Sequence, residues 1–300
     1  MKQQRKAVLF ALLAVAFWST MSSAFKITLR YIAYDQLLFW AALFAVAILA
    51  AIVFIRTDYR LLFNQTKSDI LRSALLGFLN PFAYYLVLFK AYDLLQAQEA
   101  GVLNYSWPVV LVILSVPILG QHIGLKGFIA ILISFSGLLV ISTKGNPMDL
   151  NFSNPLGVFL AVGSAFLWAL YWIINLRDKR EEQLKIFMNM IFGGAYITAY
   201  LILFSEINPP SLPALTGAAY IGIFEMGITF VFWLLALKNA TNTAKVSNLI
   251  FLSPFIALFF IHFFVGEPIL PSTIVGLFLI VTGILLQQFR FTFIKNIFSK

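Results

Sequence analysis

The sequence predicts an all-α membrane protein in which ten transmembrane helices form two inverted repeats of five helices each. The first observation is composition. Of the 300 residues, 61% are hydrophobic and 11% are charged, and the mean hydropathy is +0.91, well above that of water-soluble domains. Lipid cannot satisfy backbone N–H and C=O groups, so a spanning chain must form helices or a closed barrel. Apolar runs of about twenty residues without strict alternation predict helices.

Apolar runs separated by charged residues, proline or glycine predict ten spans. They cover residues 7–28, 36–55, 70–92, 96–119, 124–143, 155–176, 186–204, 214–237, 241–264 and 270–289. The first run follows basic residues, as a signal peptide would. However, it continues to Thr28 and carries Trp18 where a small cleavage-site residue is expected. We therefore expect this run to be the first membrane helix.

An internal repeat is the second observation. Three residues of the first half recur 146 positions later, with Pro108, Gly120 and Gly137 matching Pro254, Gly266 and Gly283. Because five spans per half is an odd number, the second half enters the membrane from the opposite face, which gives inverted repeats. We expect the first repeat at residues 7–143, a linker at 144–154 and the second repeat at 155–289.

The third observation is the distribution of positive charge. If the N-terminus is cytoplasmic, four of the 21 Lys and Arg residues fall on the outer side, namely Lys26, Arg30, Lys90 and Lys144. The other 17 face the cytoplasm, so both termini are expected there. This orientation accounts for the net charge of +9, and no nucleic-acid partner is predicted. Lys26 and Arg30 either snorkel to the outer surface or form an outer gate or lure for anionic cargo.

Several motifs resemble the EamA repeats of the drug/metabolite transporter superfamily. The stretches Ala91 to Gly137 and Ala236 to Gly283 resemble the two repeats, and Trp18 and Trp168, each beside a small residue, resemble a paired signature. Residues 104–108, Asn-Tyr-Ser-Trp-Pro, are similar to a branch that includes amino-acid exporters. The Leu-Gly-Glu motif of the family reads Leu-Gly-Gln at 119–121, whereas the second half keeps the acid as Glu267.

This resemblance implies a carrier of small metabolites in which the third, fourth, eighth and ninth helices frame a central cavity. It names no cargo, because the family carries amino acids, nucleotide-sugar-like and drug-like compounds. The sequence is therefore predicted to be a secondary transporter in the bacterial cytoplasmic membrane, for example for an amino acid or a related amphipathic compound. Export is the expected direction, and proton coupling and facilitated diffusion both stay open. A membrane-embedded enzyme and a channel are the alternative classes.

Glu225 is the one acidic residue deep inside a predicted span. An unpaired carboxylate at mid-bilayer costs at least roughly 2.5 kcal/mol. Burial disfavours the ionised form, which suits reversible protonation. The alternative is a permanently neutral carboxyl group that hydrogen-bonds to a neighbouring helix. We expect Glu225 to bind substrate or to carry the coupling proton.

Asn80 matches Glu225 when the third and eighth spans are aligned with an offset of 145, which also pairs Gly77 with Gly222. The inverted axis then brings Asn80 and Glu225 to similar depth from opposite faces. Pro81 follows Asn80 and cannot donate to the helix, so it frees a carbonyl group. We expect Asn80 to face the cavity, and Pro81 to act as a hinge or as a plain membrane-helix kink.

Pro108 and Pro254 interrupt the fourth and ninth spans at symmetric positions. Each is expected to leave an unpaired carbonyl one turn earlier, near Asn104 and Ile250. The two prolines are candidate hinges or gates, or static kinks. The amides of Asn104 and Asn248 lie in the same spans and either contact the substrate or join helices.

Aromatic residues inside the spans supply the remaining candidate contacts. Trp18, Trp107 and Trp168 lie away from the membrane interfaces, where aromatic belts form, and they could stack on a cargo or make cation–π contacts. Tyr84 and Tyr85 follow Asn80 by one turn, and one of them is expected to face the same cavity. General core packing is the alternative for each ring.

No cofactor and no metal is expected. The chain has no cysteine, which excludes disulfides and zinc–thiolate sites. The two histidines, His122 and His262, fall at opposite membrane faces in the predicted topology and cannot share a metal. The expected partners are a small-molecule substrate and membrane lipid, and the protein is predicted to be a monomer or a weak homodimer.

Single cysteines test the predicted topology directly, because the chain has none of its own. Cysteines at Lys67 and Lys179 should react with an impermeant thiol reagent from the cytoplasm. Cysteines at Lys144 and Asn208 should react from outside. Reaction of the Lys67 and Lys144 variants from the same side would refute the ten-span orientation.

Overall fold

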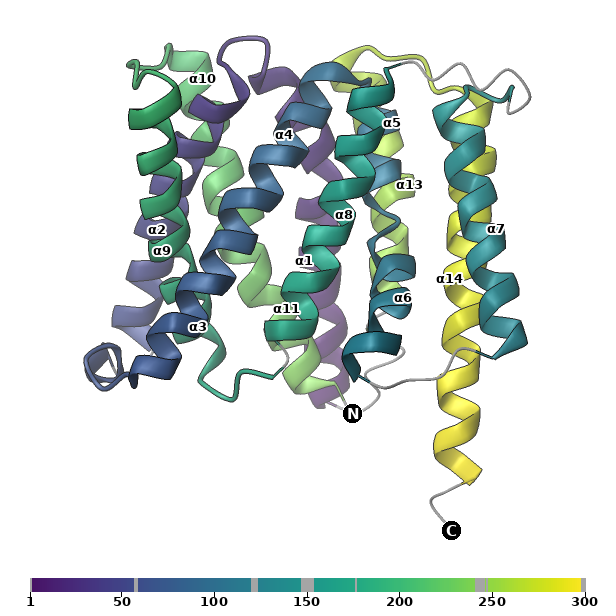
Figure 1. The fold of residues 1–300 in the computed structure, drawn as a ribbon, viewed down its shortest axis with the longest axis horizontal. Coiled ribbons are helices and arrows are strands. Elements are labelled where there is room, and N and C mark those ends of the chain that lie inside the picture. The colour runs from purple at the N-terminus through teal and green to yellow at the C-terminus, as the bar shows by residue number, and fades with distance from the viewer. Residues whose placement is uncertain are drawn as a thin grey trace.

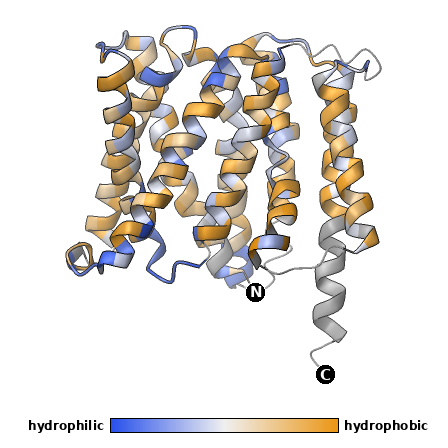
Figure 2. Cartoon of the chain, in the orientation of Figure 1, coloured by the Kyte–Doolittle hydropathy of each residue, from blue (hydrophilic) through white to orange (hydrophobic). Residues whose placement is uncertain are grey.

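The structure is a helical bundle with an apolar surface. The computed structural model describes residues 2–56, 59–119, 124–146, 154–175, 177–240, 246 and 248–297, and these residues form helices and turns without a strand. Seven described helices are long and apolar enough to cross a membrane, and three shorter apolar helices cover Gly127–Ile141, Leu249–Val265 and Pro271–Leu286. Hydrophobic residues fill the middle of the bundle and polar residues gather at its two ends (Figure 2).

Irregular turns divide several spans into shorter helices (Figure 1). The elements of the first half are α1 (Lys2–Thr28), α2 (Tyr34–Arg56), η1 (Tyr59–Leu62), α3 (Lys67–Gly77), η2 (Phe78–Ala83), α4 (Tyr84–Leu94), α5 (Ala97–Asn104), α6 (Trp107–Leu119) and α7 (Leu125–Ser142). Those of the second half are α8 (Pro155–Asn175), α9 (Glu182–Phe204), α10 (Leu212–Tyr220), η3 (Ile221–Ile228), α11 (Thr229–Asn239), η4 (Asn248–Leu252), α13 (Ser253–Phe260), η5 (Ile261–Val265) and α14 (Pro271–Ile297). α1 begins and α14 ends at the same end of the bundle.

Helices of the two halves pack against each other in a reciprocal pattern. α1 packs against α11 and α13, and the corresponding helix of the second half, α8, packs against α4, α5 and α6. α2 likewise contacts η3, and its counterpart α9 contacts η2 and α3. These contacts between the halves therefore have counterparts with the two halves exchanged, as an approximate two-fold axis requires.

The pair formed by α7 and α14 follows the same symmetry at the level of single residues. Gly137 lies so close to α14 that a Cβ atom on it would be 2.5 Å from the Gly276 carbonyl oxygen. The residues that correspond to Gly137 and Gly276 in the other half, 146 positions away, are Gly283 and Ala130. A Cβ atom on Gly283 would likewise be 2.5 Å from the Ala130 carbonyl oxygen. The Ser134 hydroxyl donates to the Ile280 carbonyl at 3.4 Å, and these two residues are themselves 146 apart. Small residues thus allow the two helices to approach closely.

The third span breaks at Asn80. Asn80 has an extended backbone (φ −149°, ψ 119°) between α3 and α4, and the Asn80–Pro81 peptide is cis. Gly193 of α9 lies against the Pro81 ring, and a Cβ atom on Gly193 would overlap it. A glycine on α9 therefore makes room for the break.

The fourth span is also interrupted, because α5 ends at Asn104 and α6 begins at Trp107. Pro108 is the second residue of α6, and its symmetry mate Pro254 is the second residue of α13. At the start of a helix the missing proline N–H removes no helical hydrogen bond. Both prolines therefore begin helical segments instead of bending continuous ones.

Charged side chains complete the helix ends at the α4–α5 junction. The Lys26 ammonium donates to the carbonyls of Tyr92 and Leu95 at 2.7 and 2.5 Å, where α4 ends. The Glu267 carboxylate accepts from the Ala97 N–H at 2.9 Å and from the Gln98 N–H at 3.4 Å, where α5 begins. A positive charge is favourable at the C-terminal end of a helix and a negative charge at the N-terminal end. The helix dipoles therefore favour Lys26 at the end of α4 and Glu267 at the start of α5. Lys26 therefore binds the carbonyl groups at the end of α4.

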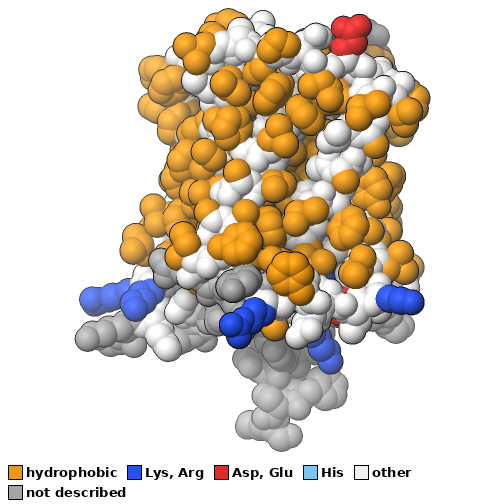
Figure 3. Space-filling model, turned by 90° about the vertical axis from the view of Figure 1, so that its left-hand side faces the viewer, with side chains coloured by type: hydrophobic (Ala, Val, Ile, Leu, Met, Phe, Trp, Pro, Cys, Tyr) orange, Lys and Arg blue, Asp and Glu red, His pale blue; other side chains and the backbone are white. Residues whose placement is uncertain are grey.

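Lys and Arg side chains visible on one face of the bundle gather at the end where α1 begins, below a broad hydrophobic band (Figure 3). Arg30, one of the expected exceptions, lies at the opposite end of α1 and donates to the Val265 carbonyl at 2.9 Å.

The close packing of α7 on α14 predicts the effect of a single methyl group. Gly137→Ala should lower the melting temperature in detergent, because the new Cβ atom forces the helices apart at a cost of about 1–3 kcal/mol. Gly163→Ala in α8 is the matched control, because nothing lies within 4 Å of the added Cβ atom. Equal melting temperatures for the two variants would contradict the close approach.

Candidate functional site

A cavity of about 120 Å³ lies between the two halves of the bundle. The first half lines it with α1, α4, α5, α6 and the residues between α5 and α6, and the second half with α8, η3, η4, α13 and η5. On α1 the lining runs from Trp18 to Phe25, a rise of about 10 Å along a helix. Because one buried water needs about 10–15 Å³, the cavity has room for a small solute.

Glu225 is the acidic residue in the lining of this cavity. Its side chain is buried, with 6% of the residue exposed. The Tyr85 hydroxyl donates to Oε1 of Glu225 at 3.1 Å. The other oxygen, Oε2, is buried and has no hydrogen-bond partner in the described structure. One acceptor of the carboxyl group is therefore left for a proton or for a donor from outside the protein.

The local backbone explains how Glu225 is held. It lies in η3, a widened helical turn in which the Thr229 N–H donates to the Phe224 carbonyl five residues earlier. Such insertions in helices occur frequently at functional sites. Three residues before Glu225, Gly222 packs so tightly on α2 that a Cβ atom would overlap the Ala41 carbonyl oxygen. η3 is therefore fixed against α2 while it presents Glu225 to the cavity.

Aromatic rings form much of the cavity wall. Trp18, Tyr84, Trp107 and Trp168 all line it, and the rings of Tyr84 and Trp168 lie 4.7 Å apart between centroids. Tyr84 is also 4.7 Å from the ring of Tyr85, which donates to Glu225. The carboxyl group is thus next to an aromatic cluster that joins α4 to α8.

Asn104 joins two helices at the cavity wall, and its expected contact with substrate stays a prediction. It lines the cavity, and its Nδ2 donates to the Ser164 hydroxyl of α8 at 2.8 Å. The Tyr84 hydroxyl donates to Oδ1 of Asn104 at 3.3 Å. Asn104 therefore joins helices of the two halves at the cavity wall.

Seven of the candidate residues line the cavity, namely Trp18, Tyr84, Asn104, Trp107, Trp168, Glu225 and Pro254. Tyr85 is fully buried behind Glu225, and Pro81 and Pro108 do not line the cavity. The side chain of Asn248 lies outside the described part of the chain. So do Gln121 and His122.

The expected position of Asn80 was wrong. The offset of 145 pairs it with Glu225, but Asn80 is not among the residues of the cavity wall. It is buried in η2, which packs against α9. The expectation assumed a continuous helix, whereas the extended backbone at Asn80 changes the direction of its side chain.

The carbonyl of Ile250, which was expected to be unpaired, has a partner, and this corrects the prediction. The Tyr105 hydroxyl donates to it at 2.6 Å, so a side chain of the first half supplies a hydrogen bond just before α13. Tyr105 stands in the Asn-Tyr-Ser-Trp-Pro motif, yet nothing in that motif indicates that its hydroxyl reaches the second half. Ser22, Tyr92, Gln98 and Ser253 also line the cavity and were not predicted.

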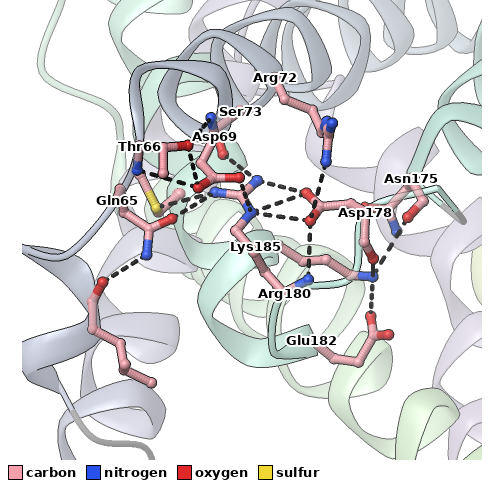
Figure 4. Close-up of polar contacts among 12 residues, drawn as sticks. Gln65, Thr66, Asp69, Arg72, Ser73, Asn175, Asp178, Arg180, Glu182 and Lys185 are labelled. Atoms are coloured by element: carbon pink, nitrogen blue, oxygen red, sulfur yellow. Dashed lines mark hydrogen bonds and ion pairs between the residues drawn. The ribbon is translucent and has the colours of Figure 1, made fainter.

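A cluster of charged side chains, none of which lines the cavity, lies where α3 begins (Figure 4). Arg180, between α8 and α9, donates to Asp178 from Nη2 at 2.6 Å and to the Ser73 hydroxyl of α3 at 2.8 Å. Arg72 of α3 lies 3.8 Å from Asp178, and Asp69 of α3 lies 3.9 Å from Arg180. This ionic cluster joins α3 to the connection between α8 and α9.

The charge state of Asp178 follows from this geometry. Burial opposes ionisation of the carboxyl group, but the hydrogen bonds and positive charge of Arg180 outweigh it and hold the pKa of Asp178 below its usual value. The side chain of Asp178 is completely buried. The Lys185 ammonium donates to the Asp178 backbone carbonyl at 3.2 Å and pairs with Glu182 at 2.7 Å.

No group of three His, Cys, Asp or Glu residues in the described part of the chain is arranged to hold a metal ion. The cavity between the two halves is the candidate site of this helical bundle.

Comparison with known proteins identifies the family. A model of the EamA-like transporter family matches residues 5–143 and 155–287, so the chain belongs to this family and the expected resemblance is confirmed. The family and its named relatives point to transport and not to catalysis. The chain is thus a multi-pass membrane protein of the drug/metabolite transporter type.

Individual relatives are distant. The chain is 26% identical over 204 residues to the uncharacterized transporter YvbV of Bacillus subtilis, a match that covers 66% of this chain and 62% of that protein. It is 23% identical over 160 residues to the aromatic amino acid exporter YddG of Ancylobacter novellus, covering 53% of this chain and 55% of that protein. A solved crystal structure with 19% identity has a TM-score of 0.67 and covers 94% of this chain and 96% of its own. That likeness supports the fold.

The ionic cluster predicts a pH-dependent stability. Because the folded pKa of Asp178 is depressed, its carboxylate stabilises the fold above the unfolded value of about 3.9. That contribution is lost as the pH falls through the folded pKa. Asp178→Asn should destabilise the protein by about 3 kcal/mol at pH 7, seen as a lower melting temperature in detergent. The difference from the wild type should shrink only below about pH 3.9.

Asp93→Asn is the control, because the Lys90–Asp93 pair is exposed at 2.8 Å and such pairs contribute little. A melting temperature of Asp178→Asn equal to that of Asp93→Asn at pH 7 would show that the ionic cluster does not stabilise the fold.

Proposed function

We propose that the protein is a secondary transporter that carries a small metabolite across the bacterial cytoplasmic membrane by alternating access. In this proposal ten spans form two inverted repeats, at residues 7–143 and 155–289, and both termini are cytoplasmic. The observation that carries the proposal is a buried carboxyl group, Glu225, with one unpartnered oxygen in a cavity between the two halves. Inverted-repeat transporters bind substrate at this kind of interface.

Reciprocal packing between the halves supports alternating access. Because each half contacts the other through equivalent helices, rocking one half on the other can open the cavity to either side. The ionic cluster around Arg180 would have to separate when the end of the bundle at α3 opens. Pro108 and Pro254 begin helical segments at the cavity level, so they are the proposed hinges.

Glu225 is the proposed site of proton coupling. A mid-membrane carboxyl group is stable when neutral and costly when charged without a partner. Titratable groups near Glu225 include Tyr84, Tyr85 and Tyr92, which are neutral donors at physiological pH. A cargo that donates a hydrogen bond to Oε2 would displace the proton from this oxygen. Movement of the cargo would thereby be coupled to movement of the proton. An enzyme would need a second acid or base beside Glu225, and a channel would need a continuous polar path.

The substrate range is proposed from the cavity and the relatives. The aromatic wall suits an amphipathic compound, such as an amino acid or a related metabolite, and the relative YddG is named as an aromatic amino acid exporter. We therefore propose export as the direction, with the protein acting as a monomer or a weak homodimer.

Glu225→Gln tests this function, because it keeps the shape of the side chain and removes the titratable proton. In proteoliposomes, uptake of labelled phenylalanine and 2-phenylethylamine should be measured with and without an imposed pH gradient. We expect the wild type to transport at least one probe faster with the gradient, and Glu225→Gln to lose this stimulation at least tenfold.

Glu206→Gln provides the matched control, since Glu206 is exposed and lies between α9 and α10. It should behave as the wild type. An undiminished response to the gradient in Glu225→Gln would remove Glu225 from the coupling mechanism.

A further inference from the structure

We infer that the cavity selects a cargo with one protonated amine on an apolar or aromatic body, a net cation, over a zwitterion or an anion. This inference rests on the proposed function and narrows it to a substrate class. It comes from the balance of charge around Glu225, from the aromatic wall, and from the way the polar groups of the cavity are already paired.

Glu225 has no counter-charge of its own. None of the residues that line the cavity in the described structure is Lys, Arg or His. The nearby cation of α1, Lys26, is bound to the carbonyls of Tyr92 and Leu95. An ionised Glu225 therefore needs a positive charge from outside the protein. The ammonium group of a cargo supplies both this positive charge and a hydrogen-bond donor.

The second oxygen of Glu225 determines where the amine binds. Oε1 accepts from Tyr85 at 3.1 Å, whereas Oε2 is buried without a partner. An ammonium group can donate to Oε2 in a charge-assisted hydrogen bond, which is about twice as strong as a neutral one. Tyr85 meanwhile fixes the orientation of the carboxylate from behind.

The aromatic wall adds a second attraction for a cation. Tyr84 and Trp168 lie 4.7 Å apart and both line the cavity, as does Trp18. The negative faces of aromatic rings attract cations most strongly where water is excluded. The same rings offer apolar area to the body of the cargo.

A carboxylate on the cargo would find poor partners. It would share a cavity of about 120 Å³ with Glu225, a like charge. Several neutral polar groups there are already paired with each other or with the backbone: Ser22 with Tyr92 at 2.7 Å, Gln98 with the Pro268 carbonyl at 2.8 Å, and Tyr105 with the Ile250 carbonyl at 2.6 Å. The cavity therefore stabilises a cationic cargo and disfavours one with its own carboxylate.

Matched ligand pairs test this selectivity in the full-length purified protein. Binding of 2-phenylethylamine and tryptamine should be compared with that of phenylalanine and tryptophan, which differ from them by the carboxylate. We expect each amine to raise the melting temperature in detergent in a saturable way and to bind at least tenfold more tightly than its amino acid. Stronger binding of the amino acids would overturn the inference.

Variants of Glu225 separate recognition from folding. Glu225→Gln should lose at least tenfold in affinity for tryptamine. Glu225→Asp, which keeps the charge, should still prefer tryptamine to tryptophan, and Glu206→Gln should bind as the wild type. If gel filtration shows that Glu225→Gln does not fold, the ligand preference of Glu225→Asp is the deciding measurement. A folded Glu225→Asp variant that no longer prefers tryptamine to tryptophan contradicts the inference.

Transport separates this inference from the proposed function. Amine binding that depends on Glu225, without uptake of any probe into proteoliposomes, would support the recognition site and refute the transporter. Uptake of phenylalanine stimulated by the gradient, together with no amine binding, would support the transporter and refute the amine site.

Discussion

A carboxylate inside a membrane has to be neutralised by a proton or by a positive partner, and Glu225 has one oxygen for which the described structure supplies neither. The rest of the site follows from this constraint. Tyr85 holds the first oxygen, η3 presents the side chain to the cavity, and Gly222 lets η3 rest directly on α2. The aromatic wall then borders the place where, in the proposed mechanism, a proton and a cationic cargo would compete.

A related constraint applies to the backbone at the ends of helices. Lipid offers no hydrogen bonds, and two helix ends in this structure are satisfied by side chains from the opposite half. Tyr105 of the first half donates to the Ile250 carbonyl of the second, and Glu267 of the second half accepts from the N–H groups at the start of α5. These bonds join the two halves, and any rocking motion has to keep or exchange them.

The sequence predicted those parts of the site that depend on composition and depth. Glu225 could be found because it is an acidic residue far from either end of a span, and Trp18, Trp107 and Trp168 because they lie away from the interfaces. Asn80 could not be placed, because alignment of the repeats assumes a helix where the backbone is extended. Gln98 and Tyr105 were missed because their partners lie more than 140 residues away, and one chain gives no signal of such pairings. The ionic cluster was missed for a similar reason, since Asp69 and Arg72 meet Arg180 and Asp178 only after folding.

Chemical modification of Glu225 in the unaltered protein tests the central claim most directly. An apolar carbodiimide reacts with protonated carboxyl groups inside membranes, and mass spectrometry of peptides identifies the modified residue. The account predicts modification of Glu225 in membranes and protection of this residue by tryptamine, with little protection by tryptophan. Modification of Glu225 at the same rate with and without tryptamine would contradict the claim that cargo binds at this carboxyl group.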